Sequence, residues 1–366
     1  MKLKVDILKF SEKLGLIQGI AERRATMPVL SHVLINASKE SLDLTVTDLE
    51  TTMVAYCDAE VFKAGGLSLP ARKLYEIVHE LPPGVIEIEE IGNYWVELRS
   101  PSTTFKIAGL PSDDFPVIPQ VSSDHLFSTQ SSKIEEMISK TIFAVSPDDL
   151  RRNLAGIYFE KNGKSNLKLA ATDGHRLSIV ESDLSTEIKL QKNVVVPKKG
   201  VSEFRKMLKL GEVIKIGCEK NFFVAMGDGM SLIVRLVDAD FPDYNQVIPK
   251  STKKSFELGR EEFLNALRRV SILSSEKTRS VKLSINKNGM TLVSVSPEVG
   301  EAKEVMALEY SGEEIDLGFN AKYLMDVLEV IPEEKVELGL TDELSPAVIK
   351  PVGDEHYLSV IMPMRV

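Results

Sequence analysis

The chain carries the same short pattern three times, and this repeat constrains its fold more than any other feature. The copies occupy residues 67–84, 194–208 and 315–328. Each copy is typical of a short strand followed by a helix that begins near Pro70, Pro197 or Asn320, because these residue types favour helix starts. With these three residues in register, the copies lie 127 and then 123 residues apart. A period of that length indicates a repeated domain rather than a solenoid unit.

Side chains at equivalent positions of the three copies agree in type. A basic residue stands two positions after the starting Pro or Asn, and an acidic residue stands four positions further on: Arg72, Lys199 and Lys322, then Glu76, Glu203 and Asp326. Apolar residues at helical spacing lie around them. An alternating strand follows each copy, at residues 85–89, 213–216 and 336–340.

The segments between these copies repeat as well, and they divide the chain into three similar units. The first half of each unit has the pattern of a strand, a helix, a basic turn and a strand, at residues 1–35, 126–159 and 255–285. The helix stripes of the first two units are expected to end at Ala21 and Thr141, and a strand that ends near a turn follows in each unit, at residues 45–48, 169–173 and 292–296. Two joints, at 114–119 and 240–249, carry matching Asp-Phe-Pro triplets and are typical of extended linkers. We therefore expect domains at residues 1–121, 122–249 and 250–366. Antiparallel-type alternation with two helices in each unit predicts the α+β class.

The composition indicates a globular chain in a reducing compartment. With 366 residues, of which 43% are hydrophobic and 27% charged, the chain can bury several cores. Cys57 and Cys218 are too few and too far apart for a disulfide framework or a zinc site, which favours the cytoplasm. Residues 1–7 alternate like a strand rather than a signal peptide, and no apolar run is long enough to span a bilayer. The net charge of −9 does not by itself indicate nucleic-acid binding.

The sharpest local motif is Ala-Thr-Asp-Gly-His-Arg-Leu at residues 171–177. Asp173 and His175 are residue types of acid–base pairs and of metal sites. No other His or Cys stands at ligand spacing, and neither a nucleophile elbow nor a phosphate-binding Gly loop accompanies them. Asp-Gly is first of all a turn sequence. The motif therefore indicates a turn within a binding surface, a turn alone or, as a third interpretation, a catalytic site.

Basic residues recur on helix faces and in turns at equivalent places in the three units. Lys198, Arg205 and Lys209 share one face of the helix in the second copy, opposite Val201 and Phe204. On a single helix such a face is commonly just solvated. Its repetition favours a surface that holds phosphates without reading bases. The candidate DNA-binding residues are Arg24, Arg151, Arg152, Lys198, Lys199, Arg205, Lys209, Lys277 and Arg279.

The closing Met-Pro-Met-Arg at residues 362–365 suits an adaptable docking surface. Together with the threefold repeat, the Asp-Phe-Pro joints and the motif at 171–177, it resembles the bacterial DNA sliding clamps, the β subunits of DNA polymerase III. The resemblance covers the whole chain. It implies three sliding-clamp domains, in a head-to-tail homodimer ring whose helices line the hole and whose sheets form the rim. It also implies no catalytic residue, metal or cofactor.

The resemblance further implies a set of partners. The ring would hold double-stranded DNA without sequence preference and would confer processivity in DNA replication. The polymerase III α subunit, the clamp loader and other proteins with a clamp-binding motif would dock on it, in the cytoplasm and away from any membrane. The chain itself would be a non-catalytic accessory subunit of the polymerase.

A pocket for partner peptides between the second and third domains follows from the same resemblance. The matching positions are Leu154, Thr172, Gly174, His175, Arg176, Leu177, Pro242, Val247, Asn320, Tyr323, Val360, Met362, Pro363, Met364 and Arg365. The third copy of the repeat contributes to this pocket at the place where Asn replaces Pro. Asn245-Gln246 stand where the family often has a basic residue, and Arg151-Arg152 stand where some members carry aromatic residues.

Two further groups of residues are candidates for the contact between copies. Ile272 and Leu273 follow a helix whose apolar stripe is already complete, so they are surplus to the core. By resemblance they meet Phe105 and Ile107, on a strand at 103–108 of the other copy, which pairs two sheet edges. The charged candidates beside them are Arg72, Arg99, Lys106, Glu298, Glu301 and Glu304.

Two other functions stay open on the sequence alone. A hydrolase would use Asp173 and His175 and would lose its turnover in a His175→Ala variant. A peptide-binding scaffold unconnected with DNA would form no ring and would respond to no circular DNA.

Overall fold

The computed structural model describes residues 1–22, 27–39, 41–148, 150–275 and 278–365. The chain divides into two compact units. The first consists of residues 1–132, 189–191 and 199–236, and the second of residues 133–188, 192–198 and 237–366. Each unit contains two antiparallel sheets.

The first unit contains a five-stranded and a nine-stranded sheet. In spatial order, the smaller sheet consists of β5 (Glu60–Lys63), β1 (Lys2–Asp6), β7 (Val85–Gly92), β8 (Trp95–Arg99) and β9 (Thr104–Ala108). The larger sheet consists of β10 (Leu110–Pro111), β6 (Gly65–Pro70), β2 (His32–Ala37), β3 (Ser41–Thr47), β4 (Thr51–Asp58), β18 (Met230–Arg235), β17 (Phe222–Gly227), β16 (Val213–Glu219) and β11 (Phe127–Gln130).

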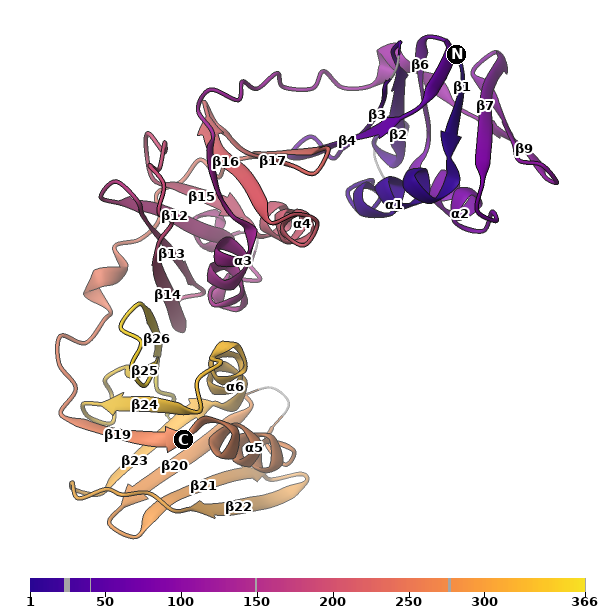
Figure 1. The fold of residues 1–366 in the computed structure, drawn as a ribbon. Helices are drawn as coiled ribbons and strands as arrows, with labels where there is room; N and C mark the ends of the chain where they lie inside the picture. Colours follow the sequence, from indigo (N-terminus) through magenta and orange to yellow (C-terminus); the bar gives the residue numbers. More distant parts are fainter. Residues whose placement is uncertain (23–26, 40, 149, 276–277, 366) are drawn as a thin grey trace. The chain divides into compact units, whose positions relative to one another are not determined.

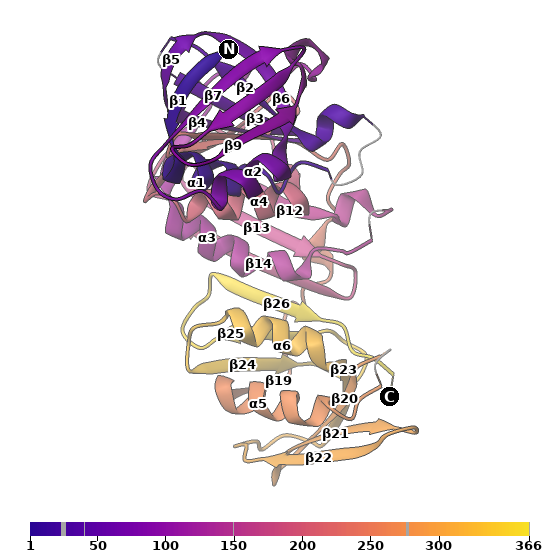
Figure 2. The same ribbon diagram turned by 90° about the vertical axis from the view of Figure 1, so that its right-hand side faces the viewer.

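The second unit contains an eight-stranded and a four-stranded sheet. The larger consists of β15 (Val194–Pro197), β12 (Gly156–Asn162), β13 (Asn166–Thr172), β14 (Arg176–Asp183), β26 (Tyr357–Ile361), β25 (Ala347–Pro351), β24 (Lys335–Leu340) and β19 (Lys254–Gly259). The smaller consists of β22 (Gly300–Met306), β21 (Gly289–Ser296), β20 (Ser280–Asn286) and β23 (Ile315–Asn320). Figure 2 shows β14, β26, β25 and β24 following one another in the larger sheet.

Short helices pack against these sheets. They are α1 (Ile7–Ile17), α2 (Ala71–His79), α3 (Ser131–Ser139), α4 (Lys198–Leu208), α5 (Arg260–Ser271) and α6 (Ala321–Val330), with the 3-10 helices η1 (Pro28–Ser31), η2 (Ser112–Asp114), η3 (Ile142–Ala144), η4 (Arg152–Leu154) and η5 (Tyr244–Gln246). In the first unit α1 lies beside α2, and in the second α5 lies beside α6 (Figure 1 and Figure 2). Helix α5 packs on β20, β21 and β22, while α6 packs on β23 and β26.

The predicted strand–helix repeat is confirmed. Strands β6, β15 and β23 run directly into α2, α4 and α6, and β7, β16 and β24 follow. The equivalent apolar residues Leu74, Val201 and Leu324 are fully buried, because each helix turns its apolar stripe toward a sheet. Two details differ from expectation. Ala21 and Thr141 are buried but lie beyond the ends of α1 and α3, so these two helices are shorter than their apolar spacing predicts.

Two sheets pass from one sequence repeat to the next. In the nine-stranded sheet, β4 pairs with β18, so that Thr51 lies opposite Val234. In the eight-stranded sheet, β14 pairs with β26, so that Arg176 lies opposite Ile361. We call these two pairings the β4–β18 seam and the β14–β26 seam. The antiparallel α+β class is confirmed, and no helix within the described ranges is long and apolar enough to cross a membrane.

Candidate functional site

A cavity of about 300 Å³ lies beside the β14–β26 seam in the second unit. Most of its lining was expected from the sequence: Leu154, Thr172, Gly174, Arg176, Leu177, Pro242, Val247, Val360 and Met362. Asn153, Asp243 and Tyr244 also line it and were not predicted, although Asp243 and Tyr244 lie within the second Asp-Phe-Pro joint. The cavity therefore gathers residues from β14, β26, η4 and the joint.

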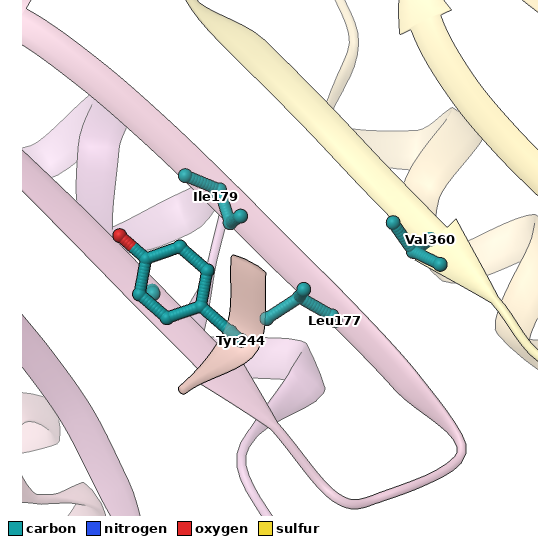
Figure 3. Close-up of a cluster of buried hydrophobic side chains, with 5 residues drawn as sticks. Leu177, Ile179, Tyr244 and Val360 are labelled. Carbon is teal, nitrogen blue, oxygen red and sulfur yellow. The ribbon is translucent and has the colours of Figure 1, made fainter. Parts of the chain in front are cut away.

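The base of the cavity is apolar. Leu177 and Ile179 on β14 approach Tyr244 of η5, and Val360 lies on β26 (Figure 3). All four side chains are buried, together with Ala170 on β13. Exposed Val247 and Met362 extend the apolar surface toward solvent, at 45% and 38% exposure. Apolar anchors of a ligand would gain most of their binding free energy here by leaving water.

The joint is fixed against the sheet by aromatic contacts and one hydrogen bond. Phe241 stacks on Tyr158, with ring centroids 4.7 Å apart. The Tyr244 hydroxyl donates a 2.5 Å hydrogen bond to Glu160 Oε2. Burial, reinforced by this carboxylate, raises the pKa of Tyr244 above its usual value, so the phenol stays a donor. These contacts hold Pro242 and Val247 in place as one wall of the cavity.

The motif at 171–177 forms a tight turn between β13 and β14. Thr172 Oγ1 accepts from Gly174 N at 3.1 Å, and Asp173 Oδ1 accepts from the backbone N–H groups of His175 and Arg176. Gly174 has φ +87°, a left-handed conformation that favours glycine. Asp173 thus serves the turn through one oxygen and binds Arg176 Nε through the other, at 3.0 Å. This geometry supports a turn within a binding surface, not an acid–base pair with His175.

Arg176 is the most highly connected side chain at the site. Its guanidinium donates to Asp173, to Asp326 Oδ2 at 2.5 Å and to the Phe143 carbonyl at 2.5 Å. It also lies over the Tyr323 ring, 4.4 Å from the centroid. The side chain is only 9% exposed, and such a buried cation requires this degree of pairing.

The C-terminal residues run along the turn. Met362 N donates to the His175 carbonyl at 2.9 Å, and Met364 N donates to the Gly318 carbonyl at 2.8 Å. These backbone bonds carry the chain past the end of β26 and hold Met362 at the cavity. The chain end is therefore part of the site.

The other predicted pocket residues lie around the cavity rather than in its lining. His175 and Tyr323 line a second cavity of about 620 Å³, which shares Arg176 with the first. Asn320 caps α6, where its side chain accepts from Lys322 N. Pro363 and Met364 are half-buried, and Arg365 is exposed.

The predicted DNA-binding residues are mostly exposed. Arg151, Arg152, Lys198, Lys199, Lys209 and Arg279 are exposed and Arg205 is half-buried, whereas Arg24 and Lys277 lie outside the described residues. Lys199 pairs with Asp48, and Arg151 lies 3.7 Å from Asp148, so part of their charge is already neutralised within the chain. Val201 and Phe204 are buried, as expected for the opposite face of α4.

Several of the predicted contact residues lie on the edge strands β9 and β22. Phe105 and Ile107 are half-buried on β9, which ends the five-stranded sheet. Ile272 is 76% exposed after α5, and Leu273 is half-buried. Part of the nearby charge is already paired within the chain: Arg99 and Lys106 with Glu97, and Glu304 with Arg269, whose hydrogen bond lowers the pKa of Glu304. Arg72 is half-buried, and Glu298 and Glu301 are exposed.

Among the residues whose placement is described, no group of three or more His, Cys, Asp or Glu side chains could hold a metal ion. Cys57 is buried, and burial raises the pKa of its thiol to about 11. What the described part of the site offers is an apolar cavity with a few fixed polar groups at its rim.

Comparison with known proteins covers the full chain. Three family models match in succession: the N-terminal domain of the DNA polymerase III beta subunit at residues 1–119, its central domain at 128–243 and its C-terminal domain at 245–365. The beta sliding clamp of Escherichia coli strain K12 is 34% identical, with all of both chains covered. That of Vibrio cholerae is 33% identical, also with full coverage.

Solved structures agree with these relatives. The DNA polymerase III subunit beta from Pseudomonas aeruginosa superposes with a TM-score of 0.94 at 33% identity, with both chains fully covered. A DnaN sliding clamp from Bartonella birtlesii, solved bound to griselimycin, gives a TM-score of 0.95, again at 33% identity and full coverage.

Proposed function

The chain belongs to the family of DNA polymerase III beta subunits, the sliding clamps of DNA replication, and we propose that two copies close head to tail into a ring around duplex DNA. In this role the chain is a non-catalytic accessory subunit. It tethers the polymerase to DNA and thereby confers processivity. We assign the three clamp domains to residues 1–121, 122–249 and 250–366, and the compartment to the cytoplasm.

The observation that carries the ring is a pair of unmatched sheet edges. Within the chain, the β4–β18 and β14–β26 seams join consecutive repeats edge to edge. Strand β9 ends the five-stranded sheet and β22 ends the four-stranded sheet, and both are described over their full length without a further partner. Pairing β9 of one copy with β22 of another would make a third seam of the same kind. It would also cover two edges that are otherwise open to aggregation.

The side chains near these edges suit a contact between copies. Exposed Ile272, together with Val305 on β22 at 65% exposure, offers apolar surface opposite Phe105 and Ile107. Exposed ion pairs contribute only about 0–1 kcal/mol each, so the apolar contacts should dominate the affinity. The internally paired Arg99, Lys106 and Glu304 contribute less than unpaired charges would.

The cavity beside the β14–β26 seam is the proposed partner site. Its apolar base fits Leu or Phe side chains of a short extended peptide, and the Thr172 turn and Arg176 offer polar groups that would orient the peptide chain. The candidate ligands are the clamp-binding segments of the polymerase α subunit, of the clamp loader and of other partners. Buried anchors of this kind commonly contribute about 2 kcal/mol or more each.

The proposal is tested by breaking the third seam. The double change Ile272→Ala with Leu273→Ala should give folded monomer, because it removes apolar surface at the contact without touching the core. Sedimentation at sub-micromolar concentration measures this. Leu344→Ala is the matched control, since Leu344 is 75% exposed in the same repeat but lies away from β22 in the sequence, and it should leave the dimer intact. A double variant that still sediments as a dimer would count against this seam.

A further inference from the structure

We infer that Asp326 is a positioning residue for partner binding, which acts by fixing the Arg176 guanidinium beside the two cavities. The inference rests on the proposed partner site and adds a residue outside its lining. Asp326 lies on α6 and does not line the 300 Å³ cavity, whereas Arg176 lines both that cavity and the 620 Å³ cavity.

Three elements hold the guanidinium, and they constrain it unequally. Asp173 belongs to the same turn as Arg176, so its bond to Nε fixes only the base of the head group. The Phe143 carbonyl lies in η3 and accepts from the second terminal nitrogen. Asp326 accepts from the first, and it is the carboxylate that links the turn to α6. The Tyr323 ring, one helical turn before Asp326, packs against the guanidinium of Arg176.

Asp326 bridges two cations. Its Oδ2 accepts from Arg176 and its Oδ1 accepts from Lys322 Nζ at 2.9 Å. The Asp326 side chain is 13% exposed, whereas that of Lys322 is 49% exposed. The Arg176 bond is therefore the better shielded of the two, and screening by water and salt weakens it less.

Loss of the carboxylate would let the Arg176 head group move. A buried guanidinium without one of its partners seeks another acceptor, since an unpaired buried charge is costly. The side chain lines both cavities, so any new position would change the width and polarity of the 300 Å³ cavity. A peptide carbonyl that accepts a hydrogen bond from Arg176 would then have to bring the guanidinium back to its original position. The free energy that this costs would weaken the affinity for the peptide.

The test measures binding of a fluorescein-labelled peptide with a Gln and spaced Leu and Phe side chains, by anisotropy on the full-length protein. Asp326→Asn should weaken binding about tenfold, in the range typical of coupled neighbours. Asp326→Glu should recover most of the affinity. Lys322→Ala is the matched control, because it removes the other cation from the same carboxylate. It should change the affinity less than about twofold.

A double-mutant cycle separates positioning from a general loss of stability. In an Arg176→Ala background, Asp326→Asn should have no further effect on the affinity, whereas Val247→Ala should still weaken binding as it does in the unaltered protein. The inference is overturned if the Asp326→Asn protein binds the peptide as tightly as the unaltered protein, or if Lys322→Ala weakens binding as much as Asp326→Asn does. It is also overturned if the effects of Arg176→Ala and Asp326→Asn on the affinity add in the double variant. If the unaltered protein does not bind the peptide at all, the partner site itself is wrong and the inference falls with it.

Discussion

The β4–β18 seam and the β14–β26 seam begin with the same kind of turn, but different side chains pack beside them. Thr47 Oγ1 accepts from Leu49 N at 3.1 Å, as Thr172 Oγ1 does from Gly174 N. Asp48 Oδ1 accepts from the N–H groups two and three residues ahead, as Asp173 Oδ1 does. The same backbone turn therefore occurs in both repeats, so the structural differences between the two seams arise from their side chains.

The largest difference lies in the adjacent helix. Gly200 in α4 is the repeat equivalent of Tyr323 in α6. A Cβ atom at position 200 would lie only 2.4 Å from Val234 Cγ1 on β18, so α4 packs directly on its seam strand. At the β14–β26 seam, the Tyr323 ring and the Arg176 guanidinium occupy the corresponding place. At the β4–β18 seam the helix backbone at Gly200 packs against the Val234 side chain, whereas at the β14–β26 seam an aromatic ring and a cation lie beside the cavity.

A second difference lies within the turn itself. Gly174 adopts φ +87° at no steric cost, whereas Leu49 holds φ +76° in the equivalent place. Leu49 is also 53% exposed, so packing offsets little of this backbone strain. The β4–β18 seam therefore carries a local cost that the β14–β26 seam avoids.

The largest effect on stability is expected where α4 approaches Val234 at the β4–β18 seam. Gly200→Ala should lower the free energy of unfolding by about 2 kcal/mol, because overpacking outweighs the better helix propensity of alanine. Chemical denaturation followed by circular dichroism measures it. Gly211→Ala is the control, since its Cβ would lie 3.9 Å from the nearest atom. A Gly200→Ala protein as stable as the control would show that α4 does not need this close approach.

Two smaller effects of opposite sign are expected for changes at the equivalent positions 174 and 49 in the two turns. Gly174→Ala should destabilise the protein by about 1 kcal/mol, because alanine disfavours the left-handed conformation. Leu49→Gly should stabilise it by about 0.5 kcal/mol, since relief of strain exceeds the entropic cost of glycine. The same denaturation curves measure both. If Leu49→Gly is destabilising, Leu49 makes a contact that its exposure does not reveal.

Much of this comparison is visible in the sequence, because the repeat register places equivalent residues together. The strand–helix units, the two Thr-Asp turns and most of the cavity lining follow from apolar spacing, turn residues and family resemblance. The ends of helices are predicted less well, as Ala21 and Thr141 show, because a residue just past the end of a helix can be buried on the same side as the helix stripe without having helical backbone hydrogen bonds.

The Arg176 network could not be predicted from the sequence. Asp173 stands three residues before Arg176 in the same motif, but Phe143 and Asp326 are far from Arg176 in the chain, and nothing in their local sequence marks them as partners of its guanidinium. The register does place Gly200 opposite Tyr323, but the consequence of that exchange depends on the 2.4 Å approach to Val234. The side-chain contacts across seams are therefore the part that requires a structure.

The most direct test of the ring compares retention on circular and linear duplex DNA. Phosphate contacts weaken steeply as salt rises, whereas a topological link does not depend on them. Protein loaded on a circle by the clamp loader should survive about 0.5 M salt, where charges are strongly screened, and a single double-strand cut should release it promptly. Equal retention on circular and linear DNA, with both lost as salt rises, would identify an ordinary electrostatic binder and contradict the ring.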